Sequence, residues 1–489
     1  MILSILVALL QSSLPQDIPA RPEELRFDEL QFEVPDPARF RRELGKGVVL
    51  YVARDSTFPL VSLRIQLRQG SYLEPSEKVG LAALTANLLR TGGTERLDPA
   101  AFDEEVEFLA ASLTAFGGDS RSGANLECIT PVLDSAMDLF FEMLRSPRFD
   151  DGRLGIEKEG ILEAMRQRND DPGDVLAREW DWLLEGESFY RSRRMTRVHL
   201  DAIRREDLVQ FHEKYWRPEN MIVSVSGDVD PETIAARIDS HLSRWPGEGA
   251  AADWPPPQPT HEPRPGAYHA EKDIPQGTVV LGHAVPRWTD WKSPERAALQ
   301  IMDHILGGSG FTSRITKRIR SDEGLAYDAG SSFGFDALGP GSFTVSFQSK
   351  DDTVALATSI ALKEIERIRV EPPSEEEMAL AKAALIETFP RRFESAAQIA
   401  GTYAGDAFIG RSHEYWKSWR EQVRSVTADD VLRAAKKYLK PEEIVFLVVG
   451  KWEEIEPGDA GGRARMKDLF GGEITHLPVR DPLTLRVVP

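Results

Sequence analysis

Two segments of the chain share the same order of polar and apolar positions. IRREDLVQFHEKYWRPENMIVSVSGDVD begins at Ile203, and VTADDVLRAAKKYLKPEEIVFLVVGKWE begins at Val426. They align without a gap, and Asp, Tyr, Pro and Gly recur at the same places in both. In each segment, apolar positions at helical spacing precede a proline and then an apolar run that ends in glycine. This pattern predicts a helix, a turn and a buried strand, and its recurrence predicts two homologous halves.

Each half also opens with a strand-like segment that precedes a helix. These segments are VSLRIQLRQG from Val61 and GTVVLGHAV from Gly277. Residues 157–168 and 375–388 are then corresponding long, charged helices with one solvated face. The mixture of strands and helices predicts an α+β fold in which each half packs helices against a sheet.

The patterns divide the chain into a first half at residues 17–244, a linker at 245–266 and a second half at 267–489. The linker is dense in proline and glycine, which favours an extended, semi-rigid conformation. Residues 1–16, MILSILVALLQSSLPQ, resemble a secretory signal peptide, although they lack a positive N-terminal region. We therefore expect a secreted or periplasmic protein. No other stretch approaches the ~20 apolar residues of a membrane-spanning helix, so no stable membrane insertion is expected.

Composition argues against further classes of function and of binding site. The formal net charge of −19 argues against a nucleic-acid surface, which would need a basic patch. The single cysteine, Cys128, excludes an intrachain disulfide and a cysteine-rich zinc site. Its apolar surroundings predict a small buried strand residue.

The stretch GLAALTANLLRTGGT, from Gly80 to Thr94, predicts an amphipathic helix that runs into a turn, because leucines recur on one helical face. None of the nine histidines has another at i+3 or i+4, so the chain has no local zinc motif. Ligands can still converge from distant segments, and spacing alone does not exclude such a site. His212, in QFHEKYW, is interpreted as a packed helix residue.

A second group of candidate residues lies in GGSGFTSRITKRIRSDEGLAY. Arg320 and Tyr327 are separated by a glycine-containing turn that can bring their tips together. Gly307, Gly308 and Gly310 precede them, but the absence of Gly-Lys-Ser/Thr excludes a phosphate-binding loop. Further on, GFDALGPG from Gly334 predicts a hairpin loop between two strands.

These segments resemble the M16 metallopeptidases, the pitrilysin, insulinase and mitochondrial processing peptidase group. The resemblance runs from about Phe32 to Val449 and implies two α+β halves that close like a clamshell around an unfolded peptide. It places an H-x-x-E-H zinc motif on the helix from Gly80, with a further glutamate some seventy-odd residues later. Here the three motif positions hold Ala83, Ala86 and Asn87.

The loss of that motif implies that this chain holds no catalytic metal. Glu159 or Glu163 falls near the expected place of the last ligand. Because one carboxylate cannot hold catalytic zinc, both are interpreted as helix-surface residues.

The resemblance assigns Arg320 and Tyr327 to substrate holding and to polarising the scissile carbonyl, since both donate hydrogen bonds to an oxyanion. It makes the segment of Gly307, Gly308 and Gly310 a flexible turn beside the peptide chamber. It also places ASLTAFGGD, with Ala115 and Phe116, on an exposed sheet edge that grips peptide by strand addition.

Some bacterial members of the family work as heterodimers in which one chain bears zinc and the other bears the Arg and Tyr. The sequence resembles the second kind: a non-catalytic, substrate-binding subunit whose zinc belongs to an M16 partner. One alternative is a structural or chaperone-like M16 homologue without protease activity. Another is an independent peptidase that uses a site without a recognisable motif.

Overall fold

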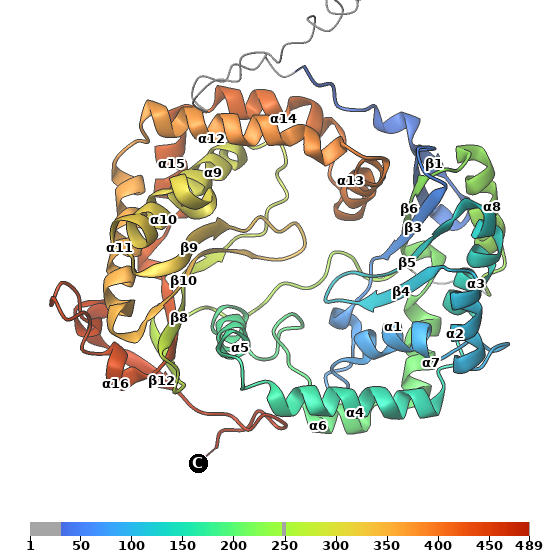
Figure 1. Cartoon of the computed structure of the whole chain (residues 1–489), viewed down its shortest axis with the longest axis horizontal. Coiled ribbons are helices and arrows are strands. Elements are labelled where there is room, and N and C mark those ends of the chain that lie inside the picture. The colour runs from blue at the N-terminus through green and yellow to red at the C-terminus, as the bar shows by residue number, and fades with distance from the viewer. Residues whose placement is uncertain (1–30, 247–250, 489) are drawn as a thin grey trace, which may run out of the picture. The chain divides into compact units, whose positions relative to one another are not determined.

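Two mixed sheets of six strands each organise the computed structural model, which describes residues 31–246 and 251–488 (Figure 1). The expected signal peptide at residues 1–16 lies outside the described residues. All elements given below belong to the unit that begins at Val34.

The first sheet has the strand order β1-β2-β6-β3-β5-β4, in which only β2 and β6 are parallel neighbours. Its strands are β1 (Arg41–Glu43), β2 (Val49–Arg54), β3 (Leu60–Leu67), β4 (Ser112–Gly117), β5 (Ser122–Ile129) and β6 (Met221–Gly227). The second sheet has the order β12-β7-β11-β8-β10-β9. Its strands are β7 (Gly266–Glu271), β8 (Gln276–Val285), β9 (Ala326–Phe333), β10 (Gly341–Lys350), β11 (Val445–Gly450) and β12 (Ile474–Leu477).

Five neighbouring strands of each sheet follow the same connectivity, and the helices between them recur in the same order. The first half contains α1 (Leu81–Thr91), α2 (Pro99–Phe108), α3 (Leu133–Arg145), α4 (Asp151–Gln167), α5 (Pro172–Glu185), α6 (Arg197–Ala202), α7 (Arg205–Tyr215) and α8 (Pro231–Ser243). The second half contains α9 (Pro294–Asp303), α10 (Arg314–Thr316), α11 (Val354–Val370), α12 (Glu375–Thr388), α13 (Ala396–Ile409), α14 (Glu414–Ser425), α15 (Ala428–Tyr438) and α16 (Trp452–Ile455). The predicted α+β fold with two homologous sheet-and-helix halves is confirmed.

The residues that recur in the aligned segments have the same structural roles. The Asp207 carboxylate accepts a hydrogen bond from the Arg204 N–H at 2.8 Å, and Asp430 accepts one from the Thr427 N–H at 2.8 Å. Each bond satisfies a backbone donor at the start of α7 or α15. Each helix is followed by a proline-initiated 3₁₀ turn and then by β6 or β11. The recurring residues therefore build the same local helix–turn–strand unit in both halves.

The strands of the first sheet alternate between a core face and a polar face. On β3, Val61, Leu63 and Ile65 are at most 2% exposed and belong to the main apolar core with α1 and α3. Successive side chains of a strand point to opposite faces, so Arg64 and Gln66 lie on the other face. Cys128, on β5, is buried in the same core as predicted, and burial raises the pKa of its thiol to about 11.

One helix from each half packs against the sheet of the other half. Helix α5 contacts β8 and β11, whereas α13 contacts β2 and β6 (Figure 1). Arg68, just after β3, donates to the Ala407 carbonyl at 2.6 Å, near the end of α13 where a helix attracts positive charge. The Tyr51 hydroxyl also lies 2.9 Å from His413 Nε2. Because these contacts cross between the halves, residues far apart in the sequence build common surfaces.

Candidate functional site

Helix α1 carries the three motif positions, and none of them presents a metal ligand. Ala83 is exposed, whereas Ala86 is 0% exposed in the apolar core. Asn87 is half-buried, and its Nδ2 donates to Glu157 Oε2 at 2.8 Å. An alanine at two of these positions leaves no side chain to bind a metal.

Glu157 is the carboxylate that the structure places beside α1, and the interpretation of Glu159 and Glu163 as helix-surface residues agrees with the structure. Both of those residues are exposed on α4, and Glu163 bonds to Arg166 and Gln167 on its own helix. Within residues 31–246 and 251–488, no group of three or more His, Cys, Asp or Glu side chains is arranged to hold a metal ion. His212, as interpreted above, is buried and its Nε2 lies 2.8 Å from the Leu144 carbonyl, and burial lowers its pKa to about 4.

A buried carboxylate that sequence reasoning missed caps the start of α1. Glu74 accepts hydrogen bonds from the backbone N–H groups of Ala82 at 2.7 Å and Gly80 at 3.0 Å. Burial raises the Glu74 pKa to about 7, although the two N–H donors and nearby Arg193 oppose that shift. Glu74 satisfies donors that a helix start otherwise leaves unpaired, so α1 is firmly positioned without any metal.

Strand β4 lies at the edge of the first sheet beside α1 (Figure 1). Phe116 is 39% exposed, and Ala115 is half-buried. Gly117 packs so closely against α1 that an added Cβ would lie 2.3 Å from the Ala82 carbonyl oxygen. In the described part of the chain, β4 has a strand neighbour on one side only, as strand addition requires, and Arg90 Nε donates to the Leu113 carbonyl of β4 at 3.1 Å.

The structure brings Arg320 and Tyr327 together on the surface of the second half. Arg320 lies on a π-helical turn, Lys317–Asp322, and Tyr327 lies on the edge strand β9. The guanidinium carbon stacks 4.5 Å from the centre of the Tyr327 ring and 4.4 Å from that of Phe311. Tyr327 is 83% exposed and Phe311 is 65% exposed. The two exposed aromatic rings orient the guanidinium by stacking, which leaves its edge available to donate hydrogen bonds.

The presence of glycine at each of the three positions before this pair has a different structural explanation. A Cβ on Gly307 would lie 2.2 Å from the Ser331 backbone nitrogen on β9, and a Cβ on Gly308 would lie 3.0 Å from Asp303. Gly310 has a positive φ of 62°, which glycine adopts without strain. Together they carry the chain past β9 and place Phe311 over Arg320. Phe311 follows GGSG directly in the sequence, which is the signal that could have singled it out.

Comparison with known proteins places these features in a family. Residues 49–179 match the model of insulinase (peptidase family M16), and residues 202–385 match the model of the peptidase M16 inactive domain. The chain belongs to the M16 family. The resemblance inferred from the sequence is thereby confirmed: the chain is an M16 homologue whose residues 202–385 match the inactive domain of the family.

Several relatives match this M16 chain over most of its length. The non-peptidase homolog YmxG of Helicobacter pylori is 25% identical over 413 residues, covering 83% of this chain and 92% of the relative. An uncharacterized zinc protease of Rickettsia felis is 24% identical over 390 residues, covering 77% of this chain and 89% of the relative. The crystal structure of a peptidase M16 inactive domain from Pseudomonas fluorescens is similar in fold. It has a TM-score of 0.75 and 22% identity, and it covers 84% of this chain and 97% of that one.

The described part of this M16 chain contains no helix of sufficient length and apolar character to span a bilayer.

Proposed function

We propose that this chain is the non-catalytic, substrate-holding subunit of an M16 peptidase pair. A zinc-bearing relative supplies the metal, and this chain supplies Arg320 and Tyr327. The observation that carries the proposal is the stacked, exposed arrangement of Arg320, Tyr327 and Phe311 in a chain whose own motif positions hold alanine and asparagine. A scaffold protein has no chemical need for this arrangement.

The geometry supports a role in which the pair binds a substrate carbonyl. A guanidinium and a phenol both donate hydrogen bonds, and donors placed in advance stabilise the negative charge that develops on a carbonyl oxygen during peptide hydrolysis. Zinc in the partner would activate the attacking water. In this chain the free edge of β4 would hold peptide in an extended conformation, with Ala115 and Phe116 beside it.

The test is to co-express the chain with a zinc-bearing M16 relative and to measure both assembly and peptide cleavage. Arg320→Ala is expected to leave assembly intact and to lower kcat/KM about a hundredfold, the usual cost of one lost oxyanion donor. Tyr327→Phe, which removes only the hydroxyl, is also expected to lower kcat/KM. The isolated chain is expected to contain no zinc and to cleave nothing.

Arg318→Ala is the matched control, because Arg318 lies on the same turn but is exposed and paired with Asp322 at 3.3 Å. Its cleavage rate should match that of the wild type. Full activity of both the Arg320→Ala and Tyr327→Phe pairs would overturn the assigned roles. Stoichiometric zinc and chelator-sensitive cleavage in the isolated chain would instead indicate an independent peptidase.

A further inference from the structure

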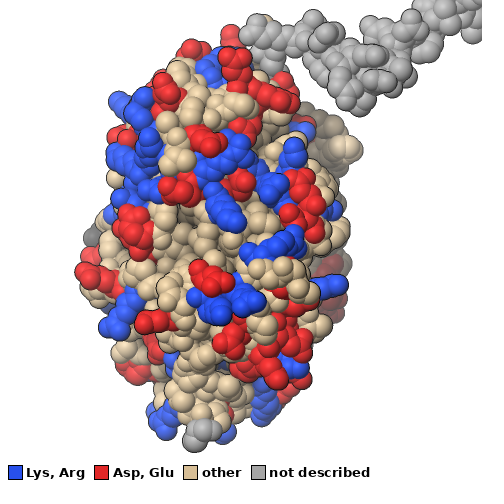
Figure 2. All heavy atoms as spheres, turned by 90° about the vertical axis from the view of Figure 1, so that its left-hand side faces the viewer, with Lys and Arg blue, Asp and Glu red and all other residues tan. Residues whose placement is uncertain are grey.

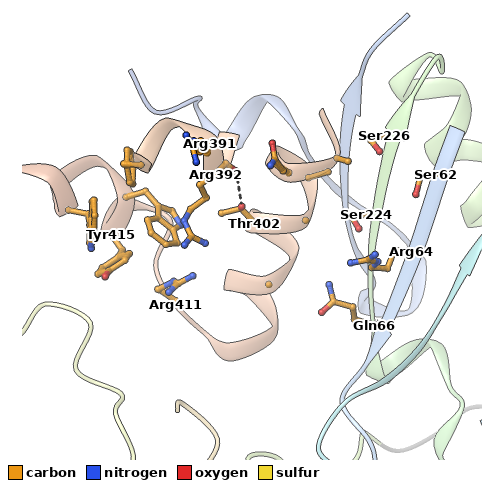
Figure 3. Close-up of a pocket in the computed structure, with 18 of the residues that line it drawn as sticks. Ser62, Arg64, Gln66, Ser224, Ser226, Arg391, Arg392, Thr402, Arg411 and Tyr415 are labelled. Carbon is orange, nitrogen blue, oxygen red and sulfur yellow. Dashed lines mark hydrogen bonds between the residues drawn. The ribbon is translucent and has the colours of Figure 1, made fainter. Parts of the chain in front are cut away.

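A cavity of about 1120 Å³ lies between the polar face of the first sheet and helices α12 to α14 (Figure 3). Arg64 and Gln66 extend from β3 toward α13, while Arg391, Arg392 and Arg411 lie on the other side of that helix (Figure 3). Neither Arg320 nor Tyr327 lines this cavity. It is therefore a second feature, separate from the pair assigned to the scissile carbonyl.

Positive charge is concentrated in this cavity. Its described lining residues contain no Asp or Glu and include six arginines, namely Arg64, Arg121, Arg296, Arg391, Arg392 and Arg411. The chain as a whole has a net charge of −19, and the outer face in Figure 2 shows acidic and basic side chains interspersed. A cavity lined by a single sign of charge, in a protein of the opposite net charge, attracts a ligand of complementary charge.

Most of these arginines lack a carboxylate partner. In the described part of the chain, Arg411 alone among the six forms an ion pair, with the buried Asp406. The guanidinium carbon of Arg121 stacks 4.1 Å from the centre of the Phe408 ring, and that of Arg392 stacks 4.4 Å from Trp416. Stacking fixes the plane of a guanidinium and leaves its N–H edge available to a carboxylate.

The cavity also contains unsatisfied hydrogen-bonding atoms of both kinds. The Arg296 Nε and Nη1 atoms are buried donors without an acceptor among the described residues. Burial, together with nearby Arg411, lowers the pKa of Arg296, and burial with Arg64 lowers that of Arg121. Gln66 is 5% exposed, and its Oε1 is a buried acceptor without a donor in the described structure. A ligand that satisfies both needs an anionic group and an N–H group.

The remaining lining favours an extended chain with apolar groups. Tyr415, Trp416 and Trp419 form an aromatic wall opposite the sheet. On α13, Gly401 and Gly405 are one turn apart, and a Cβ at either position would have nothing within 4 Å. The volume exceeds the roughly 300–1,000 Å³ of ordinary small-molecule pockets. A peptide offers carboxylates, apolar side chains and backbone N–H groups at once, whereas an inorganic anion offers only acceptors.

We propose that this arginine-lined cavity binds an acidic peptide segment, with Glu or Asp side chains on Arg64, Arg391 and Arg392 and a backbone N–H on Gln66. The inference rests on the proposed function in that the ligand is a peptide, and it adds the substrate class: segments rich in carboxylates. Arginine side chains without carboxylate partners on both sides of α13 would select acidic over neutral or basic sequences.

The test uses the isolated full chain and a fluorescein-labelled octapeptide that contains four glutamates separated by alanine and tyrosine. Fluorescence anisotropy is expected to show saturable binding that weakens as NaCl is raised, because screening reduces the attraction between charges. The same peptide with glutamine at the four positions is expected to bind at least about tenfold more weakly, since it loses the hydrogen bonds between charged groups. Equal binding of the two peptides would overturn the proposal.

Substitutions of the lining arginines test whether the peptide binds in this cavity. Arg391→Gln with Arg392→Gln, both exposed, and Arg64→Gln separately should each weaken binding about tenfold or more. The control is Arg237→Gln with Arg433→Gln, which removes the same charge from α8 and α15 and should bind as the wild type does. Loss of binding only in the control would place the site elsewhere and overturn the proposal.

Competition separates a peptide from a small anion. Unlabelled glutamate peptide should displace the probe, whereas citrate or inorganic phosphate at the same concentration should not. Equal displacement by citrate or phosphate would overturn the peptide assignment in favour of a small-anion site. Because no partner is present, these outcomes are independent of whether Arg320 and Tyr327 support cleavage.

Discussion

Helices α5 and α13 each have 14 residues and occupy corresponding places, but they meet the opposite sheets in different ways. On the second sheet, Trp180 and Leu184 of α5 pack against Val280, Val445 and Leu447 in an apolar cluster. On the first sheet, α13 leaves the arginine-lined cavity beside it. The same backbone arrangement therefore gives an apolar cluster with a smaller cavity of about 660 Å³ beside it in one half, and a larger, arginine-lined cavity of about 1120 Å³ in the other.

The side chains at corresponding positions explain the difference. Arg64 pairs with Ser224 between β3 and β6, and Val280 pairs with Leu447 between β8 and β11. In the aligned repeats Ser224 corresponds to Leu447. At this pair of positions two apolar side chains cover the second sheet, whereas the first sheet carries a serine and an exposed guanidinium whose Nε donates to Asn125 Oδ1 at 3.0 Å. In the first half, the positions that we assign to ligand binding therefore lack the apolar packing that the corresponding positions of the second half have.

The largest expected effect comes from exchanging the residues of one corresponding pair. Leu447 is 0% exposed, so Leu447→Ser is expected to lower the free energy of unfolding by about 4 kcal/mol, through lost apolar burial and a buried hydroxyl. Ser224→Leu adds a side chain beside existing space and is expected to change that free energy by less than about 1 kcal/mol. Denaturant unfolding of both variants measures the contrast. Equal losses would show that the two faces are packed alike.

Ser224→Leu also tests the binding side of the comparison. Because Ser224 lines the cavity, a leucine should reduce acidic-peptide binding while the protein remains folded. Anisotropy with the glutamate peptide measures the reduction. Unchanged peptide affinity would show that the ligand does not contact the polar face of β6.

The next effect concerns how corresponding helices begin. Helix α9 is capped by its own Ser293, whose hydroxyl accepts from the Glu295 N–H at 3.3 Å, whereas α1 depends on the buried carboxylate of Glu74. Burial raises the Glu74 pKa from 4.5 to about 7. The folded state therefore binds this proton more tightly than the unfolded chain does, and the free energy of unfolding falls as pH rises from about 4.5 to about 7.

Comparison of the wild type with Glu74→Gln isolates this contribution. Each pKa unit corresponds to about 1.4 kcal/mol, so the wild type should lose about 3 kcal/mol relative to the variant across that pH window. Above pH 7 the difference should be constant. Chemical denaturation at several pH values provides the measurement, and a wild type that gains stability relative to Glu74→Gln as the pH rises would contradict the sign.

Local patterns predicted much of this fold because they act through neighbouring residues. The helix from Leu81, the hairpin of β9 and β10, and the two repeated units all follow from periodicity, caps and turns. Sequence reasoning missed β1, β2 and β7, which precede the strands that it did identify.

The position of the carboxylate that lies beside α1 has a physical explanation. A helix rotates by about 100° per residue, so Glu157 and Glu159 face different directions on α4. Sequence spacing gives the approximate distance along α4 but not its rotation, and tertiary packing turned Glu157 toward Asn87.

The arginine-lined cavity could not be predicted from local sequence patterns, because residues far apart in the sequence form it. Alternation along β3 indicates that Arg64 and Gln66 share a face, but nothing near them in the sequence indicates that α13 covers that face. Arg391 and Arg392 come from a segment more than three hundred residues away. Contacts that cross between the halves, which no local pattern specifies, create the site.

The smallest expected effect concerns Gly401 and Gly405 inside α13, whereas the only glycine of α5 is Gly173 in its first turn. Glycine inside a helix costs about 0.5–1 kcal/mol relative to alanine, and neither Gly401 nor Gly405 has an atom within 4 Å of an added Cβ. Gly401→Ala and Gly405→Ala should therefore each raise the free energy of unfolding by about that amount. Gly410→Ala is the control: its φ of +72° strains any other residue, so that variant should be less stable. If the two stabilised variants also bind the acidic peptide more weakly, the glycines keep the cavity open at a measurable cost in stability. If their peptide affinity is unchanged, the bare face of α13 is not where the ligand lies.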